Sequence, residues 1–157
     1  AIDNGGWSMD PYIDVVQTLF NYARAQFKDL RTFFFHNTIY DALWVDPPRR
    51  RKPFHVSDLA RLDPETRFII VGDASMAPYE LMATDGSIHF EARSGRPSYE
   101  RLQFIAETFP HAVWLNPKMN DEWDYTRTIH IIREIFPMFE LTLDGLEAAV
   151  GHMMSRN

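Results

Sequence analysis

Apolar residues recur every three or four positions in several segments of the chain, which is the spacing of one face of an α-helix. This pattern predicts helices over 12–27, 57–62, 98–109, 121–136 and 142–153, with a single helical turn over 78–82. Short apolar or aromatic runs between these segments predict strands over 31–35, 40–45, 68–71, 112–115 and 138–141. A further strand ends at Asp3, where the chain has barely begun.

Strands that alternate with helices predict a mostly parallel sheet joined by right-handed crossovers. The run 68–71 is apolar throughout, as expected for a strand that helices cover on both faces. Only four residues separate 31–35 from 40–45, so these two segments should form a hairpin. We therefore predict a doubly wound, Rossmann-like α/β fold: a mostly parallel six-stranded sheet, one antiparallel edge strand, and helices on both faces.

We expect residues 1–157 to form a single domain, because no internal repeat or linker divides the chain. The opening Ala-Ile-Asp reads as the end of a buried strand, and two or three residues are few for a central strand. The expectation is that this first strand is truncated and that the chain is the C-terminal part of a longer protein. The segment 47–53, Pro-Pro-Arg-Arg-Arg-Lys-Pro, should be a surface loop.

Composition narrows the classes of partner. The formal net charge of −6 argues against broad attraction to nucleic acid or to anionic membranes. The basic run 49–52 has no interleaved aromatic residues and is interpreted as a solvated loop. Cysteine is absent, which excludes disulfides and thiolate chemistry and fits a cytoplasmic location. No apolar run approaches the roughly 20 residues that a membrane span needs.

Two of the predicted strands end in an aspartate, Asp3 and Asp73. Ligands of open α/β sheets bind at the carboxyl ends of strands, where neighbouring connections run to opposite faces. If these two strands are neighbours, the carboxylates meet there. With hydroxyls such as Ser8, Ser57 or Thr38 they would form an all-oxygen site that suits Mg²⁺. The alternative is that each aspartate only caps a helix or closes a turn.

The same residues carry a resemblance to a known family. The segment 3–12, Asp-Asn-Gly-Gly-Trp-Ser-Met-Asp-Pro-Tyr, resembles the first metal-site motif of von Willebrand factor type A (VWA) domains, Asp-x-Ser-x-Ser. The segment 72–81 resembles their second aspartate loop. Segments 114–117 and 139–146 are similar to a bacterial branch that includes accessory proteins of carbon monoxide dehydrogenase, often encoded with AAA+ ATPases of the MoxR type. The resemblance covers nearly the whole chain.

The resemblance implies a metal-ion-dependent adhesion site (MIDAS) that holds Mg²⁺, or else Mn²⁺ or Ca²⁺. Asp3 and Asp73 would hold the ion largely through waters, and Ser8 would be a direct ligand. The remaining hydroxyl ligand would be Ser57, with Thr38 as the second choice. An aspartate or glutamate of a partner protein would then occupy the open coordination position.

The chain departs from the family motif in the first loop. Gly5 stands where the motif has its first Ser, and Ser8 comes one residue later than the second Ser. The site could therefore use Asn4 or Asp10, or bind no metal. We expect Trp7 and Met76 to contact the partner, although Trp7 could instead fold inward.

We therefore predict a protein that is not an enzyme: a metal-dependent adaptor domain that acts with a MoxR-type AAA+ ATPase in metalloenzyme maturation. A second hypothesis is a Mg²⁺-dependent phosphoryl hydrolase with Asp3 as nucleophile. Such enzymes place an acid/base carboxylate two residues later, where this chain has Gly5. A third hypothesis is a VWA module whose metal site has decayed.

Overall fold

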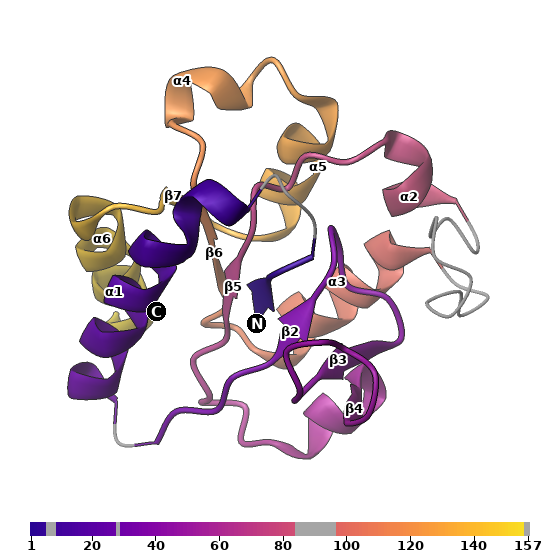
Figure 1. Ribbon diagram of the computed structural model, residues 1–157, viewed down its shortest axis with the longest axis horizontal. Coiled ribbons are helices and arrows are strands. Elements are labelled where there is room, and N and C mark those ends of the chain that lie inside the picture. The colour runs from indigo at the N-terminus through magenta and orange to yellow at the C-terminus, as the bar shows by residue number, and fades with distance from the viewer. Residues whose placement is uncertain (6–8, 28, 84–96, 156–157) are drawn as a thin grey trace.

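The centre of the molecule is a seven-stranded sheet in the order β4-β3-β2-β1-β5-β6-β7 (Figure 1). It is seen in a computed structural model that describes residues 1–5, 9–27, 29–83 and 97–155. The strands are β1 (Ile2–Asp3), β2 (Phe34–Phe35), β3 (Ala42–Trp44), β4 (Pro53–His55), β5 (Ile69–Val71), β6 (Val113–Asn116) and β7 (Met138–Glu140). The pairings of β3 with β2 and with β4 are antiparallel, and the others are parallel.

Helices cover both faces of the sheet. They are the 3₁₀ helices η1 (Asp10–Tyr12) and η2 (Val56–Arg61), and the α-helices α1 (Ile13–Gln26), α2 (Pro78–Met82), α3 (Ser98–Thr108), α4 (Asn120–Trp123), α5 (Arg127–Ile135) and α6 (Leu143–Met154). Helices α1 and α6 pack on one face, and η2, α2, α3 and α5 pack on the other (Figure 1). None of the helices in the described ranges is long and apolar enough to cross a membrane.

The alternation of side chains along the strands builds the two halves of the core. In β6, Val113 and Leu115 point toward α1 and α6, whereas Trp114 points toward α3 and α5. In β5, Ile70 and Val71 divide between the two faces in the same way. A strand that is apolar on both faces must lie between two helical layers. The predicted α/β fold, with a mostly parallel sheet and helices on both faces, is confirmed.

The number of strands was predicted wrongly: the sheet has seven, not six. The missed strand is β4, at the end of the segment that reads as a Pro-rich loop. Pro53 is its first residue, opposite Trp44, at the outer edge of the sheet, where a missing N–H costs no ladder hydrogen bond. The antiparallel strand β3 is therefore not the edge strand, because β4 covers it.

The predicted helix over 121–136 is divided into α4 and α5. Trp123 closes α4, where its side chain is buried and its indole Nε1 donates to the carbonyl of Lys118 at 2.7 Å. Tyr125 lies in the break and is 89% exposed. Helix α5 begins at Arg127, and Thr128 is buried in its first turn. Thr128 contacts the loop that follows β5.

The strand order reverses between β1 and β5. Strand β1 is followed by α1 on one face of the sheet, and β5 is followed by α2 and α3 on the opposite face. At such a switch point the two connections diverge and leave an opening beyond the carboxyl ends of the strands. Residues that end β1 and β5 therefore face the position where a doubly wound sheet binds its ligands.

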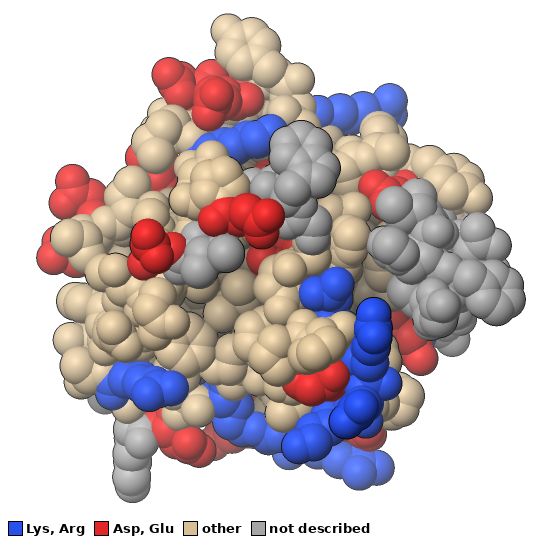
Figure 2. Space-filling view, in the orientation of Figure 1, with Lys and Arg blue, Asp and Glu red and all other residues tan. Residues whose placement is uncertain are grey.

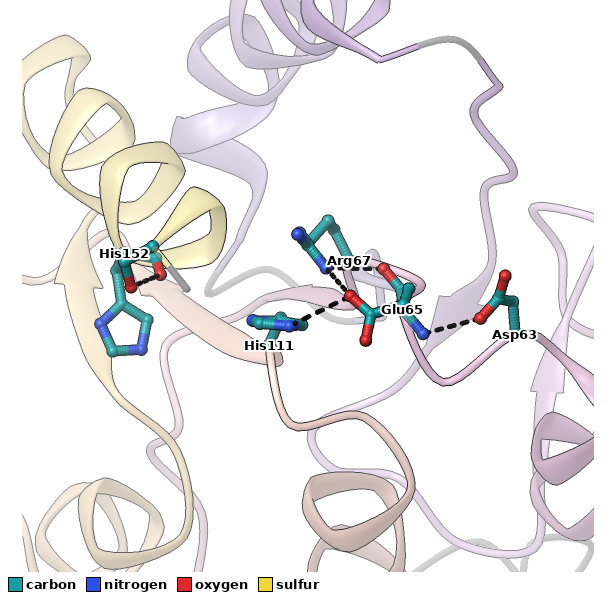
Figure 3. A network of polar contacts seen from close by, with 6 residues as sticks. Asp63, Glu65, Arg67, His111 and His152 are labelled. Atoms are coloured by element: carbon teal, nitrogen blue, oxygen red, sulfur yellow. Dashed lines mark hydrogen bonds and ion pairs between the residues drawn. The ribbon is translucent and has the colours of Figure 1, made fainter. Parts of the chain in front are cut away.

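The opposite rim, at the amino end of β5, is held by a polar network centred on Glu65 (Figure 3). The carboxylate of Glu65 lies 3.5 Å from both Arg67 and His111. Its carbonyl accepts from Arg67 at 2.7 Å, and its N–H donates to Asp63 at 2.9 Å. These contacts fix the chain as it enters β5, on the side away from the switch point.

Two glycines of α6 provide a test of the packing between this helix and β7. A Cβ atom on Gly145 would lie 1.9 Å from the carbonyl oxygen of Glu140, whereas one on Gly151 would meet nothing within 4 Å. We expect Gly145→Ala to lower the free energy of unfolding by about 2–4 kcal/mol through backbone displacement. Gly151→Ala should raise it by about 0.5–1 kcal/mol, because alanine favours helix. Urea unfolding measures both, and equal effects would contradict this packing.

Candidate metal centre

Asp3 and Asp73 lie at the carboxyl ends of β1 and β5, the two strands at the switch point. The strands are neighbours, with Ile2 opposite Val71. Asp3 packs closely against β5, because a Cβ atom at position 72 would lie 3.3 Å from the Cβ atom of Asp3. Both aspartates are buried, with exposed fractions of 1% for Asp3 and 5% for Asp73. The structure thus places the two aspartates at neighbouring strand ends of one rim, close enough for the charge of Asp73 to act on Asp3.

The carboxylate of Asp3 is only partly satisfied. Its Oδ1 accepts from the backbone N–H groups of Gly5 at 3.2 Å and Asn37 at 3.3 Å. Its Oδ2 is buried and has no hydrogen-bond partner among the described residues. The pKa of Asp3 is raised to about 7, mainly by burial and to a smaller degree by the negative charge of Asp73, against the lowering effect of the two N–H donors and of Arg49. A nearby cation would remove this cost.

The loop that carries Asp73 is held in a strained conformation. Asp73 Oδ1 accepts from the N–H of Ser75 at 3.0 Å, and Ala74 between them has a positive φ of 57°. Such a conformation is costly for a residue other than glycine and persists where surrounding contacts enforce it. Thr128 supplies two of these contacts: its hydroxyl donates to the carbonyl of Ala74 at 2.8 Å and accepts from the N–H of Met76 at 3.3 Å.

Strand β6 holds the same loop from the other side. The indole Nε1 of Trp114 donates to the carbonyl of Gly72 at 2.8 Å. The amide Nδ2 of Asn116 donates to the carbonyl of Asp73 at 2.9 Å, while its Oδ1 accepts from the N–H of Lys118 at 2.9 Å. Trp114 and Asn116 are fully buried, so their positions are set by the core. The backbone of Asp73 is therefore positioned before any ligand arrives.

The turn after β2 completes the surroundings of Asp3. Asn37, with a φ of 63°, donates its N–H to Asp3 and its side-chain Nδ2 to Glu80 Oε1 at 3.4 Å. Glu80 is buried in α2, and its Oε2 accepts from the N–H of Ala77 at 3.2 Å. Sequence reasoning missed Asn37 and Glu80. The available signal was an Asn in a tight hairpin turn, a residue that tolerates positive φ.

Gly5 has a structural reason to lack a side chain. A Cβ atom there would lie 2.4 Å from Cγ and 2.6 Å from Cβ of His36. These are the atoms nearest the backbone of His36, so the imidazole cannot swing aside without moving the turn. The imidazole of His36 thus occupies the space that the first Ser of the VWA motif would need.

The two hydroxyl residues predicted to complete the site lie elsewhere. Ser57 is exposed in η2, directly after the edge strand β4, and two strands separate β4 from β1. Thr38 is buried near the Asp3 turn, but its hydroxyl bonds Ser98 Oγ at 2.6 Å, and Ser98 donates to Ile39 O at 2.5 Å. The structure brings neither hydroxyl to the two carboxylates.

The remaining predicted residues are distributed around the first loop and α2. Ser8 and Trp7 lie outside the described residues. Asp10 is exposed at the start of η1 and, with Asp3 and Asn4, lines a cavity of about 420 Å³ beside α1. Met76 is half-buried and packs against the core, which leaves only part of its side chain for a partner.

The donor set suits a hard cation that keeps much of its water. Two adjacent carboxylates, one with a buried oxygen that lacks a donor, match the preference of Mg²⁺ for one or two carboxylates. Within the described ranges, no group of three or more His, Cys, Asp or Glu side chains could hold a metal ion. Any ion bound here would therefore depend on waters and hydroxyls for its other ligands.

Comparison with known proteins identifies no relative of this chain. No family description, curated protein or solved structure matches it significantly. The α/β fold and the position of the two aspartates are therefore known from the structure alone. The resemblance to VWA motifs comes from the sequence alone.

The raised pKa of Asp3 predicts how stability depends on pH in metal-free protein. With a folded-state pKa of about 7 against 3.8 unfolded, the folded state binds the extra proton between these values. The contribution of Asp3 to the free energy of unfolding is therefore fully present below about pH 4. It is lost as the pH rises through about 7, where the buried carboxyl becomes charged. We expect Asp3→Asn to match the wild type near pH 4 and to exceed its unfolding free energy by about 1–3 kcal/mol near pH 8.

Urea unfolding in the presence of a chelator, repeated across this pH range, measures that difference. Asp29→Asn is the matched control, because Asp29 is exposed and precedes β2 at the opposite rim. A constant difference between wild type and Asp3→Asn at all pH values would contradict the assignment.

Proposed function

We propose that this chain is a metal-dependent protein-interaction domain of the VWA type, which binds an acidic group of a partner through a MIDAS-type site. The observation that carries the proposal is the pair of buried carboxylates at the switch point, where Asp3 Oδ2 has no hydrogen-bond donor among the described residues. Two buried like charges side by side destabilise a fold unless a cation or proton offsets them. The VWA-like segments around both aspartates support the same interpretation.

In this proposal Asp3 and Asp73 hold Mg²⁺, or Mn²⁺ or Ca²⁺, with help from waters and from Ser8. The bound ion would supply a Lewis-acidic position for one carboxylate oxygen of the partner. The protein's own part is to hold the carboxylates in place before binding: Gly5 and Asn37 fix Asp3, and β6 fixes the backbone of Asp73. Carboxylates held in this way would need little rearrangement when a cation binds.

The proposal treats the domain as an adaptor and not as an enzyme. A phosphoryl hydrolase built on Asp3 would need a second carboxylate two residues later, and Gly5 stands there against the side chain of His36. The resemblance to the carbon-monoxide-dehydrogenase branch favours an AAA+ ATPase of the MoxR type as the partner, with a role in metalloenzyme maturation. A cytoplasmic location is part of this proposal and agrees with the absence of cysteine.

Titration calorimetry with Mg²⁺ and Mn²⁺ tests the metal site. We expect one binding event in the wild type, weakened about tenfold or more by Asp3→Asn or Asp73→Asn, since each removes a charged ligand. Asp29→Asn removes an exposed charge at the opposite rim and should leave the affinity unchanged. Circular dichroism of each variant checks that the fold is kept.

Three outcomes would contradict the proposed function. A wild type that binds no metal even at millimolar concentration would favour the decayed module. Metal binding that survives both aspartate substitutions would place the ion elsewhere. Hydrolysis of p-nitrophenyl phosphate that requires Mg²⁺ and disappears in Asp3→Asn would favour the phosphoryl hydrolase.

A further inference from the structure

The basic loop between β3 and β4, residues 46–52, is ordered by its own hydrogen bonds. Asp46 organises it: its carboxylate accepts the backbone N–H groups of Arg50 at 2.9 Å, Arg51 at 3.2 Å and Lys52 at 2.8 Å. These bonds, that of Arg50 foremost, lower the pKa of Asp46. The predicted surface loop, solvated at residues 50–52, is confirmed, and Asp46 gives it a defined shape.

Arg49 is the residue of this loop that reaches the candidate metal centre. Its guanidinium Nη1 donates to the side-chain Oδ1 of Asn4, the residue after Asp3. Asn4 in turn donates its Nδ2 to the carbonyl of Pro47 at 2.9 Å, so two bonds join the hairpin loop to the first loop. Arg49 is half-buried and has a positive φ of 58°, a strained conformation that points to a specific position for this side chain.

The charge of Arg49 is not neutralised by a direct ion pair. Across the described part of the chain, the ion pairs within 4.0 Å do not include Arg49. Its positive charge lowers the pKa of Asp3 without a direct ion pair between the two side chains. A half-buried guanidinium bonded to a neutral amide keeps donors for an arriving anion.

This cation does not serve metal binding, because like charges repel and a guanidinium near the two carboxylates opposes a divalent ion. Its neighbours Arg50, Arg51 and Lys52 are exposed and extend the positive charge outward from the rim. Figure 2 shows Lys and Arg side chains gathered over the β3–β4 hairpin, on a chain whose net charge is −6. The local field here is therefore opposite in sign to that of the whole molecule.

We propose that Arg49 is a second anchor for the acidic partner segment: it binds the carboxylate that reaches the metal, and the exposed residues 50–52 bind a further acidic residue beside it. This inference rests on the proposed function and adds the class of partner segment, which carries at least two acidic side chains. Arginine suits the position because its planar guanidinium can donate to one oxygen of the partner's carboxylate, while the second oxygen of that carboxylate can bind the metal ion.

The test uses the whole chain and the acetylated, amidated peptide Gly-Glu-Gly-Glu-Gly, with the peptide Gly-Gln-Gly-Glu-Gly as its partly neutral counterpart. Peptide affinity is measured in excess Mg²⁺ and in chelator, and Mg²⁺ affinity is measured separately by calorimetry. We expect Arg49→Gln to weaken binding of the diacidic peptide about tenfold and to leave Mg²⁺ affinity equal or severalfold tighter. Arg49→Lys keeps the positive charge but lacks the planar guanidinium, so its affinity for the diacidic peptide should lie between those of the wild type and Arg49→Gln.

Arg61→Gln is the matched control, since Arg61 is an exposed arginine outside the loop whose ion pair is with Asp58. It should change neither affinity beyond about twofold. If Arg49→Gln binds metal and peptide as the wild type does, the anchor is wrong and the metal site stands. If Arg49→Gln weakens metal and peptide equally, Arg49 only shapes the first loop, which also overturns the anchor. If the wild type binds no metal, the proposed function itself fails.

Discussion

The burial of two like-charged carboxylates at one rim of the sheet is the constraint on which the rest of this site depends. Asp3 and Asp73 lie near each other because β1 and β5 are neighbouring strands that end at the same rim. Moving a carboxylate out of water costs several kcal/mol, and a second negative charge adds to that cost. The fold tolerates the pair by holding Asp3 partly protonated near neutral pH, and in the proposed function a bound cation would offset the charge instead.

Around this pair, distant parts of the chain hold Asp3 and the loop after β5 in place. Strand β6 and helix α5 fix the loop after β5, and the turn after β2 fixes Asp3 through the backbone of Asn37. Both loops contain or contact a residue with positive φ, Ala74 and Asn37, and such strain persists only under strong surrounding packing. Asp3 and the backbone of Asp73 are therefore held in place by the surrounding fold.

The hairpin of β3 and β4 has two consequences for recognition. It extends the sheet by an edge strand, and its loop brings the guanidinium of Arg49 to the side chain of Asn4. A negatively charged protein thereby acquires a positive surface beside its buried carboxylates. In the proposed function this positive surface would favour an acidic partner segment over a basic one.

The sequence by itself determined most helices and strands, the two-faced core and the position of both aspartates at strand ends, because these follow from local periodicity and strand–turn–helix order. Only the tertiary structure decided that β4 joins the sheet, that His36 fills the space beside Gly5, and that Thr38 bonds Ser98. The bond from Arg49 to Asn4 spans 45 residues. Contacts of this range depend on strand order and loop conformation, and periodicity, which reports on neighbours along one element, carries no information about them.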